Sequence, residues 1–455
     1  MAAHIKNMTE GKPSSLIFTF ALPLMVGNVF QQLYTVVDTM VVGKALGVGA
    51  LAALGAADWL NWMMLGIIQG FTQGFAILMA QEFGAGRYDN LRKSIGSSAV
   101  LSLISSLVLL GAGQLLARPV LNLLQTPPEI LPDTLMYLRI MYLGVPIVMA
   151  YNLLASILRS LGDGRTPLHA MVVAAVTNIA LDLLFVLVFG FGIAGAAVAT
   201  LIAQLISSLF CLSHIRKIEL LSFKASDFRL TDRHLPLRLL MLGFPMAFQN
   251  AIISIGGMIV QFVVNGFGVI FIAGFTATNK LYGVLEVAAT SYGYSMVTYA
   301  GQNLGARKTD RIRKGVKSAI LIALLTSLVI TLLMLFAGKT ILGWFISGTP
   351  EEFEQTLQIA YYYLAIMSVC LPILYTLHIT RSAIQGMGNT VLPLVSGIAE
   401  FVMRAVTAIF LPMVIGENGI FYAEIMAWTG ATVILVISYF AVIRKMERIL
   451  VRSKT

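Results

Sequence analysis

The feature that most constrains the fold is a series of long apolar runs separated by short polar segments. A helix needs about 20 apolar residues to cross a bilayer, and the runs are of this order or longer. They cover residues 14–41, 50–80, 91–117, 133–158, 168–190, 193–215, 238–265, 271–300, 315–337, 355–382, 391–415 and 418–442. The runs are too long for transmembrane strands and lack the alternation of a barrel, so only helices can satisfy their backbone groups in lipid. The sequence therefore predicts an all-α integral membrane protein with twelve transmembrane helices.

The composition supports this prediction and the basic residues indicate an orientation. The chain is 58% hydrophobic and 11% charged, whereas a soluble domain carries about 25% charged residues. If the N-terminus lies inside, most of the 31 Lys and Arg, Arg381 among them, fall on that side, and only Lys44, Arg118 and Lys339 fall outside. This is the positive-inside pattern. It predicts a multi-pass membrane protein with both termini cytoplasmic, and it argues against nucleic acid as a partner despite the net charge of +10.

The chain contains an internal repeat. Residues 81–94 (QEFGAGRYDNLRKS) align with residues 302–315 (QNLGARKTDRIRKG) at a shift of 221, with six identities in fourteen positions. Six spans per half give both halves the same orientation, so we expect two pseudo-symmetric six-helix bundles, residues 1–215 and 238–455, joined by a cytoplasmic linker, residues 216–237. Such an architecture is typical of a secondary transporter that works by alternating access.

Acidic and amide residues within the apolar runs are the first candidates for a functional site. Asp38 lies deep in the first run, where an ionised carboxylate costs a few kcal/mol or more. Burial disfavours its charged form, so Asp38 is suited to holding a proton or a cation. Asn178 and Asp182 are spaced i,i+4 and share a helix face. Two acids and amide oxygens suit either a shared proton or a hard cation such as Na⁺, and structural hydrogen bonding is the alternative interpretation.

Other charged residues in the runs receive structural interpretations. Glu400 and Arg404 are also spaced i,i+4 and are predicted to form a buried ion pair. Glu286 lies six positions from Lys280, which is a poor helical pairing. Glu424 and Asp58 lie nearer the ends of their runs, where we expect water to solvate them.

The spacing of three glycines in the second apolar run predicts close helix packing. Gly66, Gly70 and Gly74 form a stripe of small residues that lets two helices approach closely.

The sequence has no His-Glu-x-x-His and no Gly-x-Ser-x-Gly. The segment Gly338-Lys339-Thr340 resembles the end of a phosphate-binding loop, but Leu333 stands where that motif needs its first glycine. We therefore expect neither an enzyme nor an ATP-driven pump, and no cofactor besides a coupling ion.

Several sequence blocks resemble one transporter family. They are residues 300–306 with the basic run that follows, their weaker echo at residues 81–87, residues 159–163, and the first span from Pro23 through residues 33–39. These blocks resemble the multidrug and toxic compound extrusion (MATE) family. The resemblance implies twelve helices in two six-helix lobes and a polyspecific antiporter, working as a monomer, that exports small organic, often cationic, molecules in exchange for H⁺ or Na⁺.

Within that family, the N-terminal half looks most like the prokaryotic DinF-like branch, which implies a location in the bacterial or archaeal plasma (inner) membrane. The resemblance places a cation-coupling site on Asp38, Asn178 and Asp182, with Thr200 and Asn152 as polar neighbours. A Na⁺ ion would take its ligands from the first three residues and from Thr200. We predict that the first span bends near Pro23, where a backbone hydrogen bond is already absent.

The C-terminal half offers a weaker set of candidates. The NorM-like branch carries acids on its seventh and tenth spans, but the seventh run here offers Gln249 and Asn250 instead. Family resemblance places a glutamate like Glu286 on the eighth span, so Glu286, Gln249 and Asn250 are second-rank candidates for a substrate or proton path. A flippase for lipid-linked precursors is the alternative function. It would need a cationic cleft, whereas Asp38 and Asp182 make the first lobe acidic and favour cationic substrates.

Overall fold

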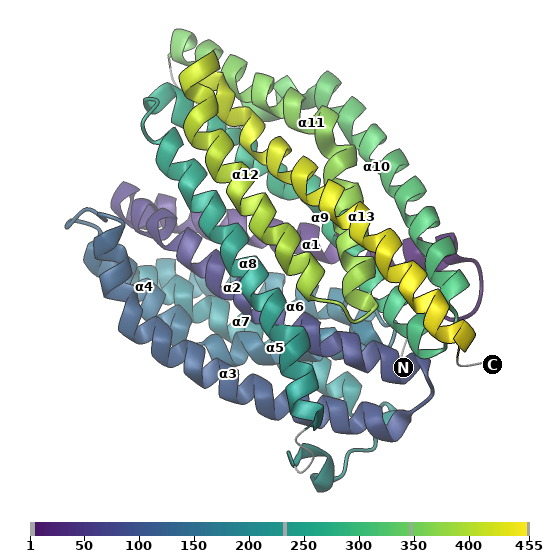
Figure 1. Ribbon diagram of the computed structural model, residues 1–455. Helices are drawn as coiled ribbons and strands as arrows, with labels where there is room; N and C mark the ends of the chain where they lie inside the picture. The colour runs from purple at the N-terminus through teal and green to yellow at the C-terminus, as the bar shows by residue number, and fades with distance from the viewer. Residues whose placement is uncertain (1–4, 231–233, 345, 347–348, 453–455) are drawn as a thin grey trace. The chain divides into compact units, whose positions relative to one another are not determined.

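The computed structural model describes residues 5–230, 234–344, 346 and 349–452, and these fold almost entirely into helices (Figure 1). The N-terminal half contains α1 (Pro13–Leu46), α2 (Val48–Gly84), α3 (Tyr88–Leu123), α4 (Leu131–Leu143), α5 (Val145–Ser160), α6 (Arg165–Asp182), the π-helical η1 (Leu183–Val188) and α7 (Gly192–Ile215). Two short 3₁₀ helices follow, η2 (Glu219–Leu221) and η3 (Ala225–Phe228). The C-terminal half contains α8 (His234–Val264), α9 (Val269–Gly305), α10 (Thr309–Gly343), α11 (Pro350–Gly386), α12 (Val391–Ile415), the 3₁₀ helix η4 (Glu417–Phe421) and α13 (Tyr422–Arg452).

The helices follow the predicted spans, with one span broken. By length and composition, ten helices could cross a membrane, and the count rises to eleven if α4 and α5, bent by 49° at their junction, form one span. The 37-residue α9 is the remaining span of the twelve. The break falls at Gly144, because Pro146 in the first turn of α5 has no N–H to donate and its ring disfavours a continuous helix. The all-α fold with its predicted spans is therefore confirmed.

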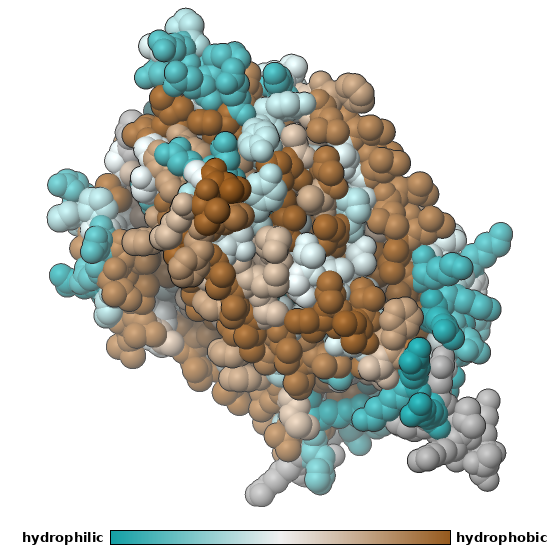
Figure 2. Space-filling model, turned by 45° about the horizontal axis from the view of Figure 1, so that its top comes forward, coloured by the Kyte–Doolittle hydropathy of each residue, from teal (hydrophilic) through white to brown (hydrophobic). Residues whose placement is uncertain are grey.

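Large apolar side chains cover the outer surfaces of several helices. On α3, Leu107 and Leu115 are 55% and 77% exposed, and on α10 Leu325 and Phe336 are 57% and 86% exposed. Figure 2 shows such hydrophobic side chains over most of the face that it presents. Apolar exposure on this scale is expected of a surface that faces lipid.

The described chain divides into two compact units. Unit 1 comprises residues 1–7 and 23–251, and unit 2 comprises residues 8–22 and 252–455. The predicted lobes, residues 1–215 and 238–455, differ from these units in two segments, because the first parts of α1 and α8 each belong to the opposite unit. Residues 1–4, 231–233 and 453–455 of the predicted lobes and linker lie outside the described residues.

The glycine stripe explains why the first part of α8 belongs to unit 1. A Cβ added to Gly70 would lie 2.4 Å from the Cα of Ala247, and one added to Gly74 would lie 2.4 Å from the Cα of Gly243. Only glycine therefore allows α2 and α8 to approach backbone to backbone. The predicted packing role of the stripe is confirmed.

The repeated motif explains why the start of the chain belongs to unit 2. The backbone N–H of Met8 donates to Gln302 Oε1 at 2.8 Å, and the amide of Asn303 donates to the Met8 carbonyl at 3.1 Å. Arg311 donates to Asn303 Oδ1 at 3.0 Å and to the Gly11 carbonyl at 2.9 Å. The polar residues of this motif therefore have an anchoring role.

Candidate functional site

Two carboxylic acids come together inside unit 1. Asp38 lies on α1 and Asp182 is the last residue of α6 before the π-helical turn η1, a type of distortion that is frequent at functional sites. Their exposed fractions are 8% and 0%, and the two carboxyl groups are close enough to act on each other electrostatically. Among the described residues, no donor reaches Asp38 Oδ1 or either carboxylate oxygen of Asp182. A hydrogen bond between two carboxyl groups requires a proton on one of them, so the chemistry of this pair suits a proton or a cation.

The predicted neighbours of the acids contribute unequally. Asn178, one turn before Asp182 on α6, is buried, and its Nδ2 donates to Thr200 Oγ1 at 3.4 Å. Its Oδ1 has no donor among the described residues. Asn152 on α5 turns its amide to the Val148 carbonyl of its own helix, at 2.9 Å. The structure thus brings Asn178 and Thr200 into contact, while the amide nitrogen of Asn152 is used within α5.

Sequence reasoning missed two tyrosines and a glutamine near the acid pair. Tyr34 lies one turn before Asp38, interacts with Gln204 of α7, and feels the charge of both acids, as does Tyr137 of α4. The i,i+4 spacing of Tyr34 and Asp38 could have revealed the first tyrosine. Tyr137 and Gln204 come from other helices, and no spacing within one helix predicts such a contact.

The unit 1 cluster offers oxygen atoms to a ligand. The oxygens without a donor among the described residues belong to Asp38, Asp182, Asn178 and Gln204. Carboxylate and amide oxygens suit a proton or a hard cation. No group of three or more His, Cys, Asp or Glu side chains in the described part of the chain could hold a metal ion. A site for Na⁺ would therefore depend on amide and hydroxyl oxygens in addition to the two carboxylates.

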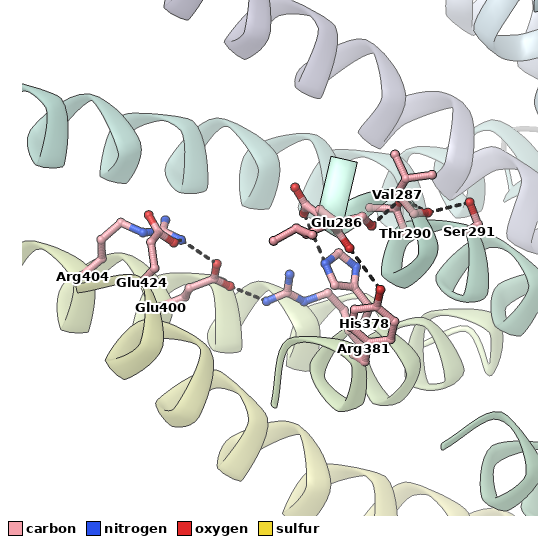
Figure 3. Close-up of polar contacts among 11 residues, drawn as sticks. Glu286, Val287, Thr290, Ser291, His378, Arg381, Glu400, Arg404 and Glu424 are labelled. Atoms are coloured by element: carbon pink, nitrogen blue, oxygen red, sulfur yellow. Dashed lines mark hydrogen bonds and ion pairs between the residues drawn. The ribbon is translucent and has the colours of Figure 1, made fainter. Parts of the chain in front are cut away.

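The charged residues of unit 2 form a chain of ion pairs across α11, α12 and α13 (Figure 3). Arg404 Nη2 lies 3.1 Å from Glu400 Oε1 and 2.7 Å from Glu424 Oε2, and Arg381 Nη2 lies 2.6 Å from the other oxygen of Glu400. The contact expected from the i,i+4 spacing of Glu400 and Arg404 is thus present, within a larger network. A buried charge that already has an oppositely charged partner needs no ligand to neutralise it.

One expectation about this network was wrong. Glu424 does not depend on water, because it pairs with Arg404 and its side chain is only 17% exposed. Arg381, counted with the basic residues of the cytoplasmic side, has a partner that sequence reasoning did not predict: it is 9% exposed and pairs with Glu400. Both partners are contributed by a different helix, so the linear sequence gave no sign of either contact.

Glu286 of α9 has a partner that sequence reasoning missed. His378 of α11 places its Nε2 3.4 Å from Glu286 Oε1, and Figure 3 shows the histidine between Glu286 and Arg381. Lys280, the basic residue nearest to Glu286 in sequence, is exposed. The pair His378–Glu286 joins residues 92 positions apart, which explains why it was missed.

The remaining candidates lie in unit 1. Gln249 and Asn250 belong to the first part of α8, whereas Glu286 belongs to unit 2, so the structure does not group the three residues in one unit. The Asn250 amide donates to the Gly66 carbonyl of α2 at 2.8 Å. Pro23 lies inside α1, at the residue where unit 1 resumes. A bend at Pro23 stays a prediction.

Comparison with known proteins identifies the family. The model of the family MatE matches residues 23–184 and again residues 245–410. The chain belongs to the MATE family. The two matches, one in each half, agree with the internal repeat, and membership of a family of transporters indicates no catalytic activity.

Relatives and solved structures support the same conclusion. This MATE chain is 31% identical over 306 residues to the probable multidrug resistance protein YpnP of Bacillus subtilis, covering 67% of this chain and 68% of that protein. It is 26% identical over 368 residues to DNA damage-inducible protein F of Escherichia coli, covering 78% and 77%. A transporter of the MOP superfamily from Pyrococcus furiosus superposes with a TM-score of 0.90 at 22% identity, covering 97% and 98% of the two chains, which shows a common fold.

Family membership settles the broad class of the protein. It is a multi-pass membrane transporter with small-molecule substrates, and the flippase alternative is not favoured by these relatives. The roles of the individual site residues do not follow from membership and stay predictions.

Proposed function

We propose that this MATE protein is a secondary active antiporter that exports small organic cations of varied shape in exchange for protons. Na⁺ at the same site is the alternative coupling ion. The observation that carries the proposal is the Asp38–Asp182 pair of buried carboxyl groups, in which no donor of the described residues reaches three of the four oxygens. The similarity to YpnP, a probable multidrug resistance protein, supports organic substrates.

Exchange requires that the ion and the substrate weaken each other's binding. Coupling between two ligands is a reciprocal free energy, and a carboxyl group that both ligands need is the simplest source of it. When the acid pair is ionised, it attracts an organic cation. When a proton neutralises it, that attraction falls, and the substrate leaves as rocker-switch alternating access exposes the site to the other side.

Transport of ethidium, a fluorescent organic cation, in proteoliposomes tests the proposal. A pH gradient and a Na⁺ gradient are imposed separately, with the membrane potential clamped in both cases. We expect accumulation driven by the pH gradient alone. Accumulation driven by Na⁺ at clamped pH, and indifferent to the pH gradient, would make Na⁺ the coupling ion, and equilibration without accumulation would exclude antiport.

The direction of transport depends on the orientation, which we propose from the basic residues. Both termini and the linker are then cytoplasmic. Ser226, an exposed residue of η3, replaced by Cys in a chain without Cys211 and Cys370, should resist an impermeant thiol reagent in intact cells. Glu129→Cys, in the loop before α4, should react. The reverse pattern would invert the orientation.

A further inference from the structure

The charged residues of unit 2 do not balance. Its chain of contacts contains three carboxylates, Glu286, Glu400 and Glu424, but only two guanidinium groups, Arg381 and Arg404. Glu400 and Glu424 lie against guanidinium groups, whereas Glu286 lies against the imidazole of His378, at 3.4 Å, and forms no ion pair with Arg or Lys among the described residues. One carboxylate is therefore in excess whenever that imidazole is neutral. An imidazole changes its charge between about pH 5 and 8 and is suited to such a position.

The charged side chains linked to His378, directly or through the chain of ion pairs, come from four helices. They are Glu286 of α9, Arg381 of α11 itself, Glu400 and Arg404 of α12, and Glu424 of α13. The helix α10, which also packs against α11, has no charged residue between Lys317 and Lys339. The Glu400 carboxylate feels the charge of His378, so the histidine is electrostatically part of the same network.

Glu286 is also placed to meet a ligand. Its side chain is 26% exposed and that of His378 is 18% exposed, whereas those of Glu400 and Arg404 are each 5% exposed. Tyr282 lies one turn before Glu286 on α9 and stacks on Trp428, with ring centroids 5.8 Å apart. A carboxylate beside an aromatic ring is a combination that recognises organic cations, through charge and through the face of the ring.

We propose that His378 and Glu286 form a protonation switch in unit 2, at which a proton on His378 and an organic cation at Glu286 exclude each other. Protonated His378 holds the Glu286 carboxylate in an ion pair. Neutral His378 leaves that carboxylate to the cation, with Tyr282 beside it. This is a coupling point separate from the Asp38–Asp182 pair. Its ligand rests on the proposed function, whereas the switch itself does not.

A double-mutant cycle tests the switch without any substrate. The apparent melting temperature of the purified protein is measured at pH 5.5 and pH 8.0 for the parent, His378→Gln, Glu286→Gln and the double variant. We expect an interaction between the two residues at pH 5.5 that largely disappears at pH 8.0, because an ion pair with histidine exists only while the ring is charged. As a matched control, the same cycle is run on Glu82 and Arg87, which form an ion pair at 2.6 Å. Their interaction should be the same at both pH values. A His378–Glu286 interaction that is absent at pH 5.5, or equal at both pH values, overturns the proposal.

Ethidium binding, followed by fluorescence anisotropy, tests the exclusion. In the parent, affinity should fall between pH 8.0 and pH 5.5, and His378→Gln should reduce that fall. His378→Lys keeps a cation beside Glu286 and should weaken binding at pH 8.0 at least about fivefold, the lower end of typical coupling. Normal affinity in His378→Lys, with an unchanged pH dependence in His378→Gln, refutes the exclusion. If the parent binds no ethidium, the proposed substrate class is wrong, and the double-mutant cycle on melting temperature still tests whether His378 and Glu286 form the protonation switch.

Discussion

The two units treat buried carboxylates in opposite ways. In unit 1, Asp38 and Asp182 face each other, and no donor of the described residues reaches three of their four oxygens. In unit 2, Glu400 lies against two guanidinium groups and Glu424 against one. A paired charge is already neutralised, whereas an unpaired one must find a mobile ion. This difference is the reason why we propose that exchange takes place in unit 1, whereas most of the unit 2 charges have a structural role.

Energetics support this division. Removing one member of a buried ion pair is strongly destabilising because the charge of the remaining partner is then neither compensated nor solvated by water. A buried acid without an oppositely charged partner takes up a proton, so replacing it leaves no uncompensated charge behind. Replacing residues in unit 2 should thus affect folding first, and replacing residues in unit 1 should affect transport first.

The largest effect on transport is expected at the acid pair. Asp38→Asn keeps the size of the protonated acid but cannot release a proton, so the variant should fold and reach the membrane yet lose proton-driven ethidium export on the order of 100-fold, near the upper end of typical coupling. Asp182→Asn should lose a similar amount. The measurement is uptake into proteoliposomes at matched protein content.

The control for this prediction is an exposed acid of the same unit. Glu129→Gln, in the loop before α4, should export ethidium as the parent does. Glu286→Gln should impair export less than Asp38→Asn. If Asp38→Asn exports like the parent while Glu286→Gln abolishes export, coupling resides in unit 2 and the comparison is reversed.

The next largest effect is on stability, at Arg404. Arg404→Met leaves Glu424 without its cation and Glu400 with one partner instead of two, at a cost of about 3–5 kcal/mol. The variant should melt at a clearly lower temperature. Adding Glu424→Gln removes a stranded charge and should recover part of the loss. Arg87→Met, at an ion pair whose arginine side chain is 55% exposed, should cost at most about 1 kcal/mol. Equal losses for Arg404→Met and Arg87→Met would contradict the division between the units.

The sequence predicted contacts within a helix better than contacts between helices. Apolar run length located the spans, and i,i+4 spacing found Glu400–Arg404 and the common face of Asn178 and Asp182. Arg381 and His378 escaped, because their partners belong to other helices and no periodicity connects residues in different helices. Family resemblance, rather than spacing, brought Asp38 together with Asp182.

The division of the chain into units shows the same limit. The linker was the natural boundary in sequence, since it is polar and separates two similar halves. The contacts of Gly70, Gly74 and Gln302 instead attach the first part of α8 to unit 1 and residues 8–22 to unit 2. The glycine stripe predicted a close helix contact but could not name its partner.

The smallest effect is expected at Thr200, and it separates the two candidate coupling ions. Thr200 Oγ1 accepts a hydrogen bond of 3.4 Å from Asn178 and donates one of 3.1 Å to the Ala196 carbonyl. If protons are exchanged, Thr200→Val removes these two hydrogen bonds but no ligand of the coupling ion, and export should fall no more than about fivefold, equivalent to about 1 kcal/mol. If Na⁺ is exchanged, the same change removes an oxygen ligand, and Na⁺-driven export should fall much further while Thr200→Ser, which keeps the hydroxyl, stays near the parent. Export is measured for both variants under each gradient. A small loss of pH-driven export, with no Na⁺-driven export in the parent or in either variant, fits a proton held between Asp38 and Asp182. A large loss of Na⁺-driven export that serine rescues would mean that the unit 1 oxygens bind a metal ion.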